Sequence, residues 1–205
     1  MSRKVHQQMV AVARSIEPRL AKAIATTGPL RLTRKRQASP FVDVLCRAVA
    51  GQQLSVKAAQ SIWDRVLEAA RHEPLSDFLH RAEPSTLREC GLSGAKAKAM
   101  GEIAKAGRAG ALNPGVLRRL DHAARSEHLT AIWGVGPWTA DMMGIFYFSD
   151  PDIWPDGDVA ARKTLERLTS RRRSTVRTAE RFAPYRSYLA LHMWRHVAGV
   201  PGIQT

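Results

Sequence analysis

The sequence predicts an all-α protein in which short helices are joined by short loops. Apolar residues recur at intervals of three and four through much of the 205-residue chain, which is the spacing of one helix face. No segment shows the sustained alternation of apolar and polar residues that marks a half-buried strand. Serine and proline also stand where helices would begin. These three observations favour helices throughout and make a sheet improbable.

The first helical pattern covers residues 3–26. Pro18 lies inside it, and a proline within a helix removes a hydrogen bond, so we expect two short helices here. Residues 28–37 are polar and basic without periodicity and are interpreted as a linker. A Ser-Pro pair at residues 39–40 then provides the cap and first position of an apolar helix that ends near Ala50.

A turn over residues 51–54 separates that helix from the next one, which Ser55 caps and which ends near Arg71. Trp63 lies on the apolar stripe of this helix and is interpreted as a core residue. Two short helical turns are expected within residues 74–91.

Ser93 is expected to cap a helix that ends between residues 107 and 110, and a short helix over residues 114–120 leads into a glycine turn. After an acidic turn, another helix ends near Leu168. Pro184 opens the last helix.

The glycine turn contains Gly134 and Gly136, which permit positive φ and the close approach of another backbone. Pro137 suits the first position of the helix that follows. Such a turn at a helix N-terminus points free N–H groups outward, which suits a phosphate. The acidic turn downstream holds Asp156 and Asp158. The stretch therefore predicts a DNA-phosphate anchor joined to a catalytic acid.

The composition sets the class of partner. A net charge of +14 attracts polyanions, nucleic acid first and an anionic membrane surface second. No apolar run approaches the roughly 18 residues needed to cross a bilayer, and no secretory signal is recognisable at the start. Cys46 and Cys90 are too few for a disulfide framework or a four-thiolate site. We expect an intracellular protein, cytoplasmic and nucleoid-associated in a bacterium or nuclear in a eukaryote, without membrane attachment.

Four segments, in the order in which they occur, resemble one known family. They are AGQQLSVKAA at 50–59, GLSGAKAKAM at 91–100, LTAIWGVGPWTA with PDGD within 129–158, and PYRSYLALHMW at 184–194. Together they resemble the helix-hairpin-helix (HhH-GPD) DNA glycosylases, and within them the 3-methyladenine DNA glycosylase II branch. The likeness runs through most of the chain from about residue 28.

The resemblance implies a two-lobed helical fold with the active site in the cleft between the lobes. The whole chain, 1–205, would form a single glycosylase unit. A central lobe would cover residues 38–148 and end in the helix-hairpin-helix, and residues 1–37 with 149–205 would form the second lobe. Residues 1–37 cannot supply the N-terminal β-rich domain of longer relatives, so the chain resembles the compact form. We expect a monomer.

The resemblance also implies the reaction. The protein would excise alkylated bases, of the 3-methyladenine and 7-methylguanine type, from double-stranded DNA by hydrolysis of the N-glycosidic bond in base excision repair. Asp158 matches the family's essential aspartate, and a carboxylate there stabilises positive charge on the sugar. Asp156 is expected to shape the turn or cap the helix. Trp138 replaces the Schiff-base lysine of lyase members, which predicts no AP-lyase activity. No cysteine follows Cys90, so the family's iron–sulfur cluster is not expected.

Recognition of the damaged base is expected to be aromatic. Trp138 and Trp194 match pocket tryptophans of the family, and an indole face favours a cationic, flipped-out base. Gln53 and Leu54 match the turn that wedges into the base stack and fills the gap left by the flipped nucleotide. The side chain of Trp133, like that of Trp154, is interpreted as part of the core.

The phosphate contacts are expected to come from Gly134, Gly136 and Lys96. The resemblance further implies a monovalent cation, Na⁺ or K⁺, in the hairpin and no other cofactor. Its ligands would be the backbone carbonyls of Thr130, Trp133 and Val135.

Three alternatives compete with this interpretation. A sister glycosylase for uracil or other deaminated bases would differ from it at few pocket residues. A noncatalytic helix-hairpin-helix DNA-binding module would need neither the acidic turn nor the pocket tryptophans. A helix-turn-helix regulator would need a polar recognition helix, whereas residues 138–148 are largely apolar.

Overall fold

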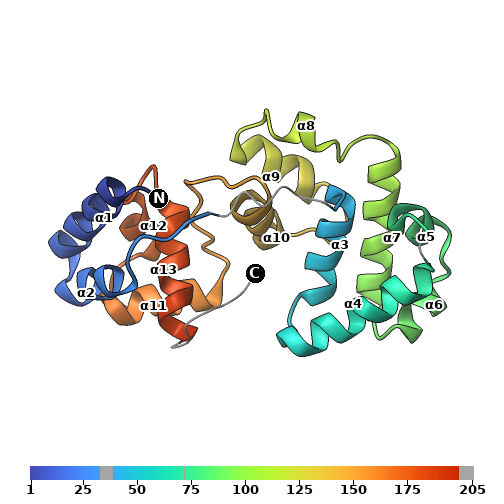
Figure 1. Cartoon of the computed structure of the whole chain (residues 1–205), viewed down its shortest axis with the longest axis horizontal. Coiled ribbons are helices and arrows are strands. Elements are labelled where there is room, and N and C mark those ends of the chain that lie inside the picture. The colour runs from blue at the N-terminus through green and yellow to red at the C-terminus, as the bar shows by residue number, and fades with distance from the viewer. Residues whose placement is uncertain (33–38, 72, 199–205) are drawn as a thin grey trace. The chain divides into compact units, whose positions relative to one another are not determined.

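The computed structural model describes residues 1–32, 39–71 and 73–198, and within them every regular element is a helix (Figure 1). The all-α prediction is therefore confirmed. The chain forms two compact units, one from Met1–Lys35 with Asp141–Thr205 and the other from Arg36–Ala140. In the described residues no helix combines the length and the apolar character needed to span a bilayer.

The first unit brings the two ends of the chain together around one core. Its fully buried residues include Leu20, Ile24, Leu165 and Leu189, and each such side chain contributes about 1.5–3 kcal/mol through its burial. Helix α13 (Arg186–Ala198) packs against α2 (Pro18–Thr27) and α11 (Val159–Leu168), as Figure 1 shows. The helices are α1 (Arg3–Ile16), α2 (Pro18–Thr27), the π-helix Met143–Tyr147, α11 (Val159–Leu168), α12 (Thr175–Glu180) and α13 (Arg186–Ala198).

The second unit is arranged around its longest helices. Its elements are α3 (Phe41–Gly51), α4 (Val56–Ala70), α5 (Leu75–Arg81), α6 (Pro84–Glu89), α7 (Gly94–Arg108), α8 (Pro114–Leu117), α9 (His122–Thr130) and α10 (Pro137–Met142). Helix α7 packs against α3, α5 and α6. Its Met100 and Ile103 are fully buried, and Trp63 of α4 is 5% exposed, which confirms its assignment to the core.

Most helix boundaries follow from local chemistry. Ser55 accepts a hydrogen bond from the Ala58 amide at 3.2 Å, and Ser93 accepts one from the Lys96 amide at 3.3 Å, so both predicted caps are confirmed. Pro18 begins α2 as expected, with Glu17 in an extended conformation between the two helices. The predicted linker is non-helical over its described part, residues 28–32, and the remainder lies outside the described residues.

Four expectations are wrong in detail, and one of them is the start of the last helix, which begins at Arg186 and not at Pro184. The residue before α3 is Pro40, which is extended at φ −54° and ψ 148°, so the serine ahead of it is one position too early to cap the helix. The helix expected over residues 114–120 ends at Leu117, and a separate helix, α9, follows with Asp121 as its cap. Helix α9 is mostly polar, so its apolar periodicity is weak. Similarly, α12 was not expected between Leu168 and Pro184.

The helix that begins at Pro137 changes its winding after Met142. Met143 to Tyr147 form a π-helix, and the Phe148 amide donates to the Met143 carbonyl at 3.0 Å, five residues back. Such π turns often occur at functional sites because they shift one side chain out of helical register. The boundary between the two units falls inside this segment, after Ala140.

Candidate functional site

Asp158 is fixed in place by the turn that carries it and by the helix that it starts. Its amide donates to the Pro155 carbonyl at 2.8 Å, which closes the turn. Its Oδ1 accepts from the Ala161 amide at 2.8 Å and so caps α11. A negative charge at a helix N-terminus is also favoured by the helix dipole. The carboxylate is therefore both half-buried and oriented before any ligand arrives.

The indole of Trp194 holds the same carboxylate oxygen. Its Nε1 donates to Asp158 Oδ1 at 2.9 Å, so one oxygen receives a backbone donor and a side-chain donor. The two residues come from α13 and from the start of α11, two helices that pack together in the first unit. The structure thus joins the predicted catalytic acid to one of the two predicted pocket tryptophans.

Asp156 does not cap the helix, which was one of the two roles expected for it. Its Oδ1 accepts from the Thr175 hydroxyl at 3.1 Å, and its own side chain is exposed. The cap of α11 is Asp158, so the expectation that Asp156 would cap the helix is wrong. Asp156 instead connects the acidic turn to the start of α12.

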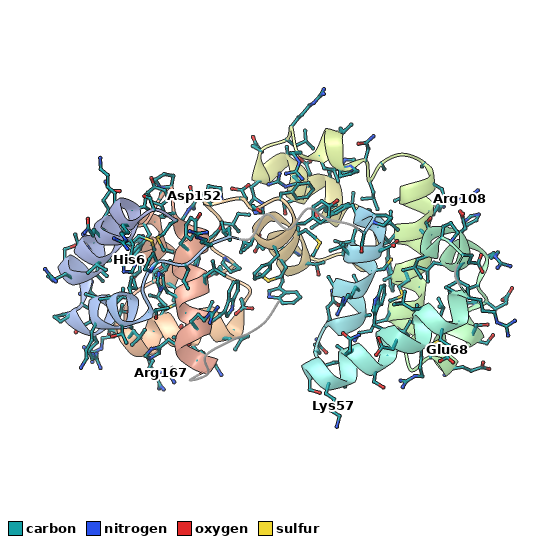
Figure 2. The ribbon with its side chains drawn as sticks, in the orientation of Figure 1. His6, Lys57, Glu68, Arg108, Asp152 and Arg167 are labelled. Carbon is teal, nitrogen blue, oxygen red and sulfur yellow. The ribbon has the colours of Figure 1, made fainter. Side chains whose placement is uncertain are left out.

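The loop ahead of the acidic turn is fastened to the start of α13. Asp152, labelled in Figure 2, accepts from Arg186 Nε at 2.8 Å and Nη2 at 2.9 Å. Burial disfavours the charged carboxyl of Asp152, but the hydrogen bonds and charge of Arg186 outweigh that effect and lower its pKa. The Ser187 hydroxyl donates to the Asp150 carbonyl at 2.7 Å and accepts from the Ile153 amide at 2.9 Å. These hydrogen bonds hold residues 150–153, the segment that leads to the acidic turn with Asp158, against the start of α13.

An aromatic pair stands beside Asp158. The ring of Phe146 stacks on Trp194 with centroids 5.6 Å apart and an interplanar angle of 29°. Phe146 is 39% exposed, whereas its neighbours Ile145 and Tyr147 in the π-helix are buried. Sequence reasoning missed Phe146, because an apolar run offers no sign of which member a π turn will expose.

The glycine hairpin lies in the second unit between α9 and α10. Gly134 has φ +86°, and a Cβ built on it would overlap the Cβ of Ala99 on α7. Only glycine fits both the conformation and the space. Among the described residues, no acceptor lies within hydrogen-bonding distance of the Gly134 and Gly136 amides. These N–H groups can therefore donate to a ligand such as a phosphate.

The hairpin carbonyls divide into two sets. In the hairpin, the carbonyls of Leu129, Ile132 and Gly136 accept backbone hydrogen bonds. In the part of the chain that the structure describes, the other carbonyls of residues 129–136, which include the three predicted as cation ligands, accept no such bond outside a helix, and oxygen ligands of this kind suit a hard cation. The residues therefore fit the expected monovalent ion. The three carbonyls are those of Thr130, Trp133 and Val135.

The side chain of Trp133 is not in the core. It is 46% exposed, and the Lys98 ammonium lies 4.3 Å from its ring centroid, a cation–π arrangement. The core assignment of Trp133 is wrong, whereas Trp154 packs half-buried against the core of the first unit, as expected.

The predicted wedge turn is exposed and conformationally strained. Gln53 has φ +57°, in the left-handed region that non-glycine residues avoid, at a cost of about 1–2 kcal/mol. Leu54 is 40% exposed, and its amide donates to the Gly51 carbonyl at 3.3 Å. Both side chains of the predicted wedge therefore face solvent within the second unit.

Two residues of the second unit hold that turn. The Lys96 ammonium donates to the carbonyls of Ala50 at 2.8 Å and Gln52 at 2.7 Å. The Gln52 amide Nε2 donates to the buried Thr139 hydroxyl at 2.8 Å. Gln52 was not anticipated, because a glutamine in a turn carries no sequence signal for a partner so far along the chain.

The remaining predicted pocket residue, Trp138, is half-buried on α10 in the second unit. The candidate residues thus form two groups, one in each unit. Asp158, Trp194 and Phe146 form the first group. The second comprises Gln53, Leu54, Lys96, Trp138 and the hairpin residues.

No group of three or more histidine, cysteine, aspartate or glutamate side chains in the described residues could hold a metal ion. The two cysteines are buried and free.

Known proteins resemble this chain in sequence and in fold. The DNA-3-methyladenine glycosylase 1 of Schizosaccharomyces pombe is 30% identical over 185 residues, 86% of this chain and 80% of that protein. A crystal structure of DNA-3-methyladenine glycosidase from Bacillus halodurans has a TM-score of 0.76 at 26% identity, over 91% of this chain and 88% of the other. The 3-methyladenine DNA glycosylase of S. pombe, solved with abasic DNA, has a TM-score of 0.78 at 24% identity and covers 97% of this chain and 100% of its own.

The family model described as HhH-GPD superfamily base excision DNA repair protein matches residues 46–184. That span includes the wedge turn, the glycine hairpin and the acidic turn, and it covers well over half of the chain. The chain therefore belongs to the HhH-GPD superfamily of base excision DNA repair proteins.

Proposed function

We propose that this protein is a DNA glycosylase that excises alkylated bases of the 3-methyladenine and 7-methylguanine type from double-stranded DNA. The observation that carries the proposal is the Asp158 carboxylate, which is held at one oxygen by the Ala161 amide and the Trp194 indole. The family membership and the relatives named as 3-methyladenine glycosylases support the same reaction.

The chemistry follows from charge development in the transition state. As the bond between the sugar C1′ and the base nitrogen breaks, positive charge builds on the deoxyribose. A carboxylate that is already oriented stabilises this charge without having to reorganise. Water then adds to C1′, and Asp158 is placed to orient it or accept its proton. An N-alkylated purine is cationic, so it leaves as a neutral base with the bonding electrons and needs no added proton.

Base selection is assigned to aromatic faces. The Trp194–Phe146 stack lies beside the carboxylate, and an indole face attracts a cationic ring more strongly than a neutral one. We assign Trp138 of the second unit to base recognition on the basis of the family resemblance. The preference for cationic bases separates this function from the excision of uracil and hypoxanthine, which are neutral.

The chain carries no amine at the position of the lyase nucleophile. Trp138 stands there, and an indole cannot form a Schiff base with the sugar aldehyde. The protein therefore acts as a monofunctional enzyme that leaves an abasic site in an uncut strand.

DNA is bound through several parts of the second unit. The amides of Gly134 and Gly136 donate to a backbone phosphate, and the Gln53–Leu54 turn enters the duplex where the base has flipped. The carbonyls of Thr130, Trp133 and Val135 would hold a Na⁺ or K⁺ ion, which supplies positive charge beside that phosphate. The net charge of +14 adds nonspecific attraction. A monomer supplies all of these residues.

The test is a base-release assay with duplexes that differ only in the lesion. One duplex is methylated at purine nitrogens, and the others carry uracil or hypoxanthine. We expect release of 3-methyladenine and 7-methylguanine and negligible release of the neutral bases. Preferential release of uracil or hypoxanthine would reassign the enzyme to deaminated bases. Tight DNA binding with no release from any duplex would indicate a noncatalytic DNA-binding module.

A further inference from the structure

We propose that Lys96 and Gln52 are positioning residues that hold the Gln53–Leu54 turn in the shape with which it enters DNA. This inference rests on the proposed function, because a wedge is needed only where a base is flipped. It gives Lys96 a role inside the protein in place of the expected contact with a DNA phosphate.

Lys96 closes the C-terminal end of α3. Carbonyls at the end of a helix lack partners within the helix and carry the negative end of its dipole. The Lys96 ammonium donates to two such groups, the carbonyls of Ala50 at 2.8 Å and Gln52 at 2.7 Å. The ammonium is thus an internal cap for α3, donated from α7, and it fixes the backbone from which the wedge turn departs.

Burial around Lys96 is consistent with this role. Lys96 is half-buried, and desolvation lowers the pKa of its ammonium. A lysine placed for a DNA phosphate would extend into solvent and keep its donors available. Two of the three ammonium donors of Lys96 are already used within the protein.

The side chain of Gln52 makes a second contact that holds the turn, through a hydrogen bond to α10. Its Nε2 donates at 2.8 Å to the hydroxyl of Thr139, which is 1% exposed. Thr139 lies on α10, directly after Trp138 and two residues after the proline that begins this helix. The turn is therefore connected to the same helix that follows the glycine hairpin.

The hairpin and the wedge turn also share α7 as a support. Lys96 on α7 holds the turn, while Lys98 stacks on Trp133 of the hairpin and Ala99 packs against Gly134. One helix thus sets the position of two parts that are proposed to contact DNA. The phosphate anchor and the wedge are thereby fixed relative to each other within the second unit.

The turn needs such support because its own geometry is unfavourable. Gln53 is held at φ +57°, a conformation that L-residues avoid, and Leu54 keeps 40% of its surface in water. Backbone strain of this kind persists only where the surroundings over-determine the conformation. Lys96 and Gln52 provide that constraint, because their hydrogen bonds hold the backbone and the side chain directly before the strained residue.

The experiment compares Lys96→Met with Lys105→Met. Both substitutions remove one positive charge from α7, but Lys105 is exposed in its last turn. Wedge insertion is followed with a duplex that contains a tetrahydrofuran abasic analogue next to 2-aminopurine, whose fluorescence rises on unstacking. Single-turnover release from methylated duplex and the salt dependence of DNA binding are measured in parallel. Lys96→Arg and Thr139→Val complete the set.

For Lys96→Met we expect the fluorescence change to be lost and excision to fall about tenfold, as one charged hydrogen-bonding group would account for. The slope of the logarithm of its DNA-binding constant against the logarithm of the salt concentration should match the slope for Lys105→Met. Lys96→Arg should restore most of both signals, because a guanidinium can reach the same carbonyls. Thr139→Val keeps the side-chain shape and should weaken insertion through Gln52 alone, which keeps the test decisive if Lys96→Met does not fold.

Three outcomes are distinguishable. A wild-type protein that releases no base would overturn the proposed glycosylase before the variants are compared. An active wild type with normal insertion in Lys96→Met and Thr139→Val would overturn the positioning role. A salt slope lower by about one unit in Lys96→Met than in Lys105→Met, with normal insertion, would make Lys96 a phosphate contact instead.

Discussion

The indole Nε1 of Trp194 donates a 2.9 Å hydrogen bond to Asp158 Oδ1, the oxygen that also caps α11. Trp194, which is proposed to line the base pocket, and Asp158, which is proposed as the catalytic acid, are therefore linked by a direct hydrogen bond. A shift of the indole would move the carboxylate, and loss of the carboxylate would release the indole. This coupling determines what substitution at either residue should do.

Trp194→Phe should impair catalysis more than it impairs binding. Phenylalanine keeps an aromatic face for the base and for the stack with Phe146, but it removes the donor to Asp158. A hydrogen bond to a charged group contributes about 1.5–3 kcal/mol, so we expect the single-turnover rate to fall by about tenfold to a hundredfold.

The matched control for that variant is Trp154→Phe. It makes the same chemical change in the same unit, and the Trp154 Nε1 has no hydrogen-bond partner among the described residues. Its excision rate should remain within about twofold of wild type, because the donor that it removes makes no hydrogen bond to the described residues and does not touch Asp158. Equal rates for the two variants would show that the Trp194 donor is unimportant.

Abasic DNA should not be captured covalently. Without an amine at position 138, sodium borohydride should trap no protein–DNA adduct, and the strand should break only after alkali. Denaturing gels of the reaction with and without borohydride provide the measurement, with a known lyase as the positive control. A trapped adduct would identify another nucleophile and exclude the monofunctional assignment.

Acid should destabilise the first unit through His192. This side chain is buried, both its ring nitrogens lack partners among the described residues, and its ring lies 5.8 Å from that of His6. Burial, with the nearby charges of His6 and the N-terminus, lowers the pKa of His192 to about 3. An unfolded histidine accepts a proton near pH 6.5, so the unfolded state binds more protons between these values.

The free energy of unfolding should therefore decrease as the pH falls from about 6.5 towards 3, by up to about 1.4 kcal/mol per pH unit from this residue. Urea unfolding at pH 7 and pH 4.5 measures the effect. His192→Leu should lose less stability over that interval than wild type. His196→Leu, which removes an exposed histidine from the same helix, serves as the control. Identical pH dependence in His192→Leu and wild type would contradict this account of the buried ring.

The two hairpin glycines should respond differently to alanine. Gly134→Ala places a side chain at φ +86° and against Ala99, so we expect a loss of about 2 kcal/mol or more and a lower Tm. Gly136→Ala meets no atom within 4 Å of its new Cβ and should change Tm little. Its effect should be seen in DNA affinity instead. Similar Tm values for both variants would contradict the proposed packing of the hairpin on α7.

The sequence predicted those features that depend on neighbouring residues. Ser55 and Ser93 cap their helices because a cap needs only its own hydroxyl and an amide three residues later. Helix α9 was not separated from its neighbour because its polar sequence lacks a strong apolar period. The π-helix was not foreseen either, and with it the exposure of Phe146.

The parts of the site that were missed depend on distant residues. Asp158 could be singled out from its turn and the family resemblance, but its partner Trp194 lies 36 residues away. A phosphate contact of Lys96 stays a prediction, but the contacts of Lys96 with the end of α3 were not foreseen. The carbonyls that it binds are 44 and 46 residues distant, a relation that one sequence does not reveal.

The most direct test of the proposed mechanism compares Asp158→Asn with Asp156→Asn. Asparagine is as good a helix cap as aspartate and can still accept from Trp194, so Asp158→Asn removes the charge while keeping the fold. We expect its single-turnover release of 3-methyladenine and 7-methylguanine from methylated duplex to fall at least about a hundredfold, with Tm and DNA affinity unchanged. Asp156→Asn should remain close to wild type. Excision by Asp158→Asn within a few-fold of wild type would contradict the assignment of Asp158 as the catalytic acid.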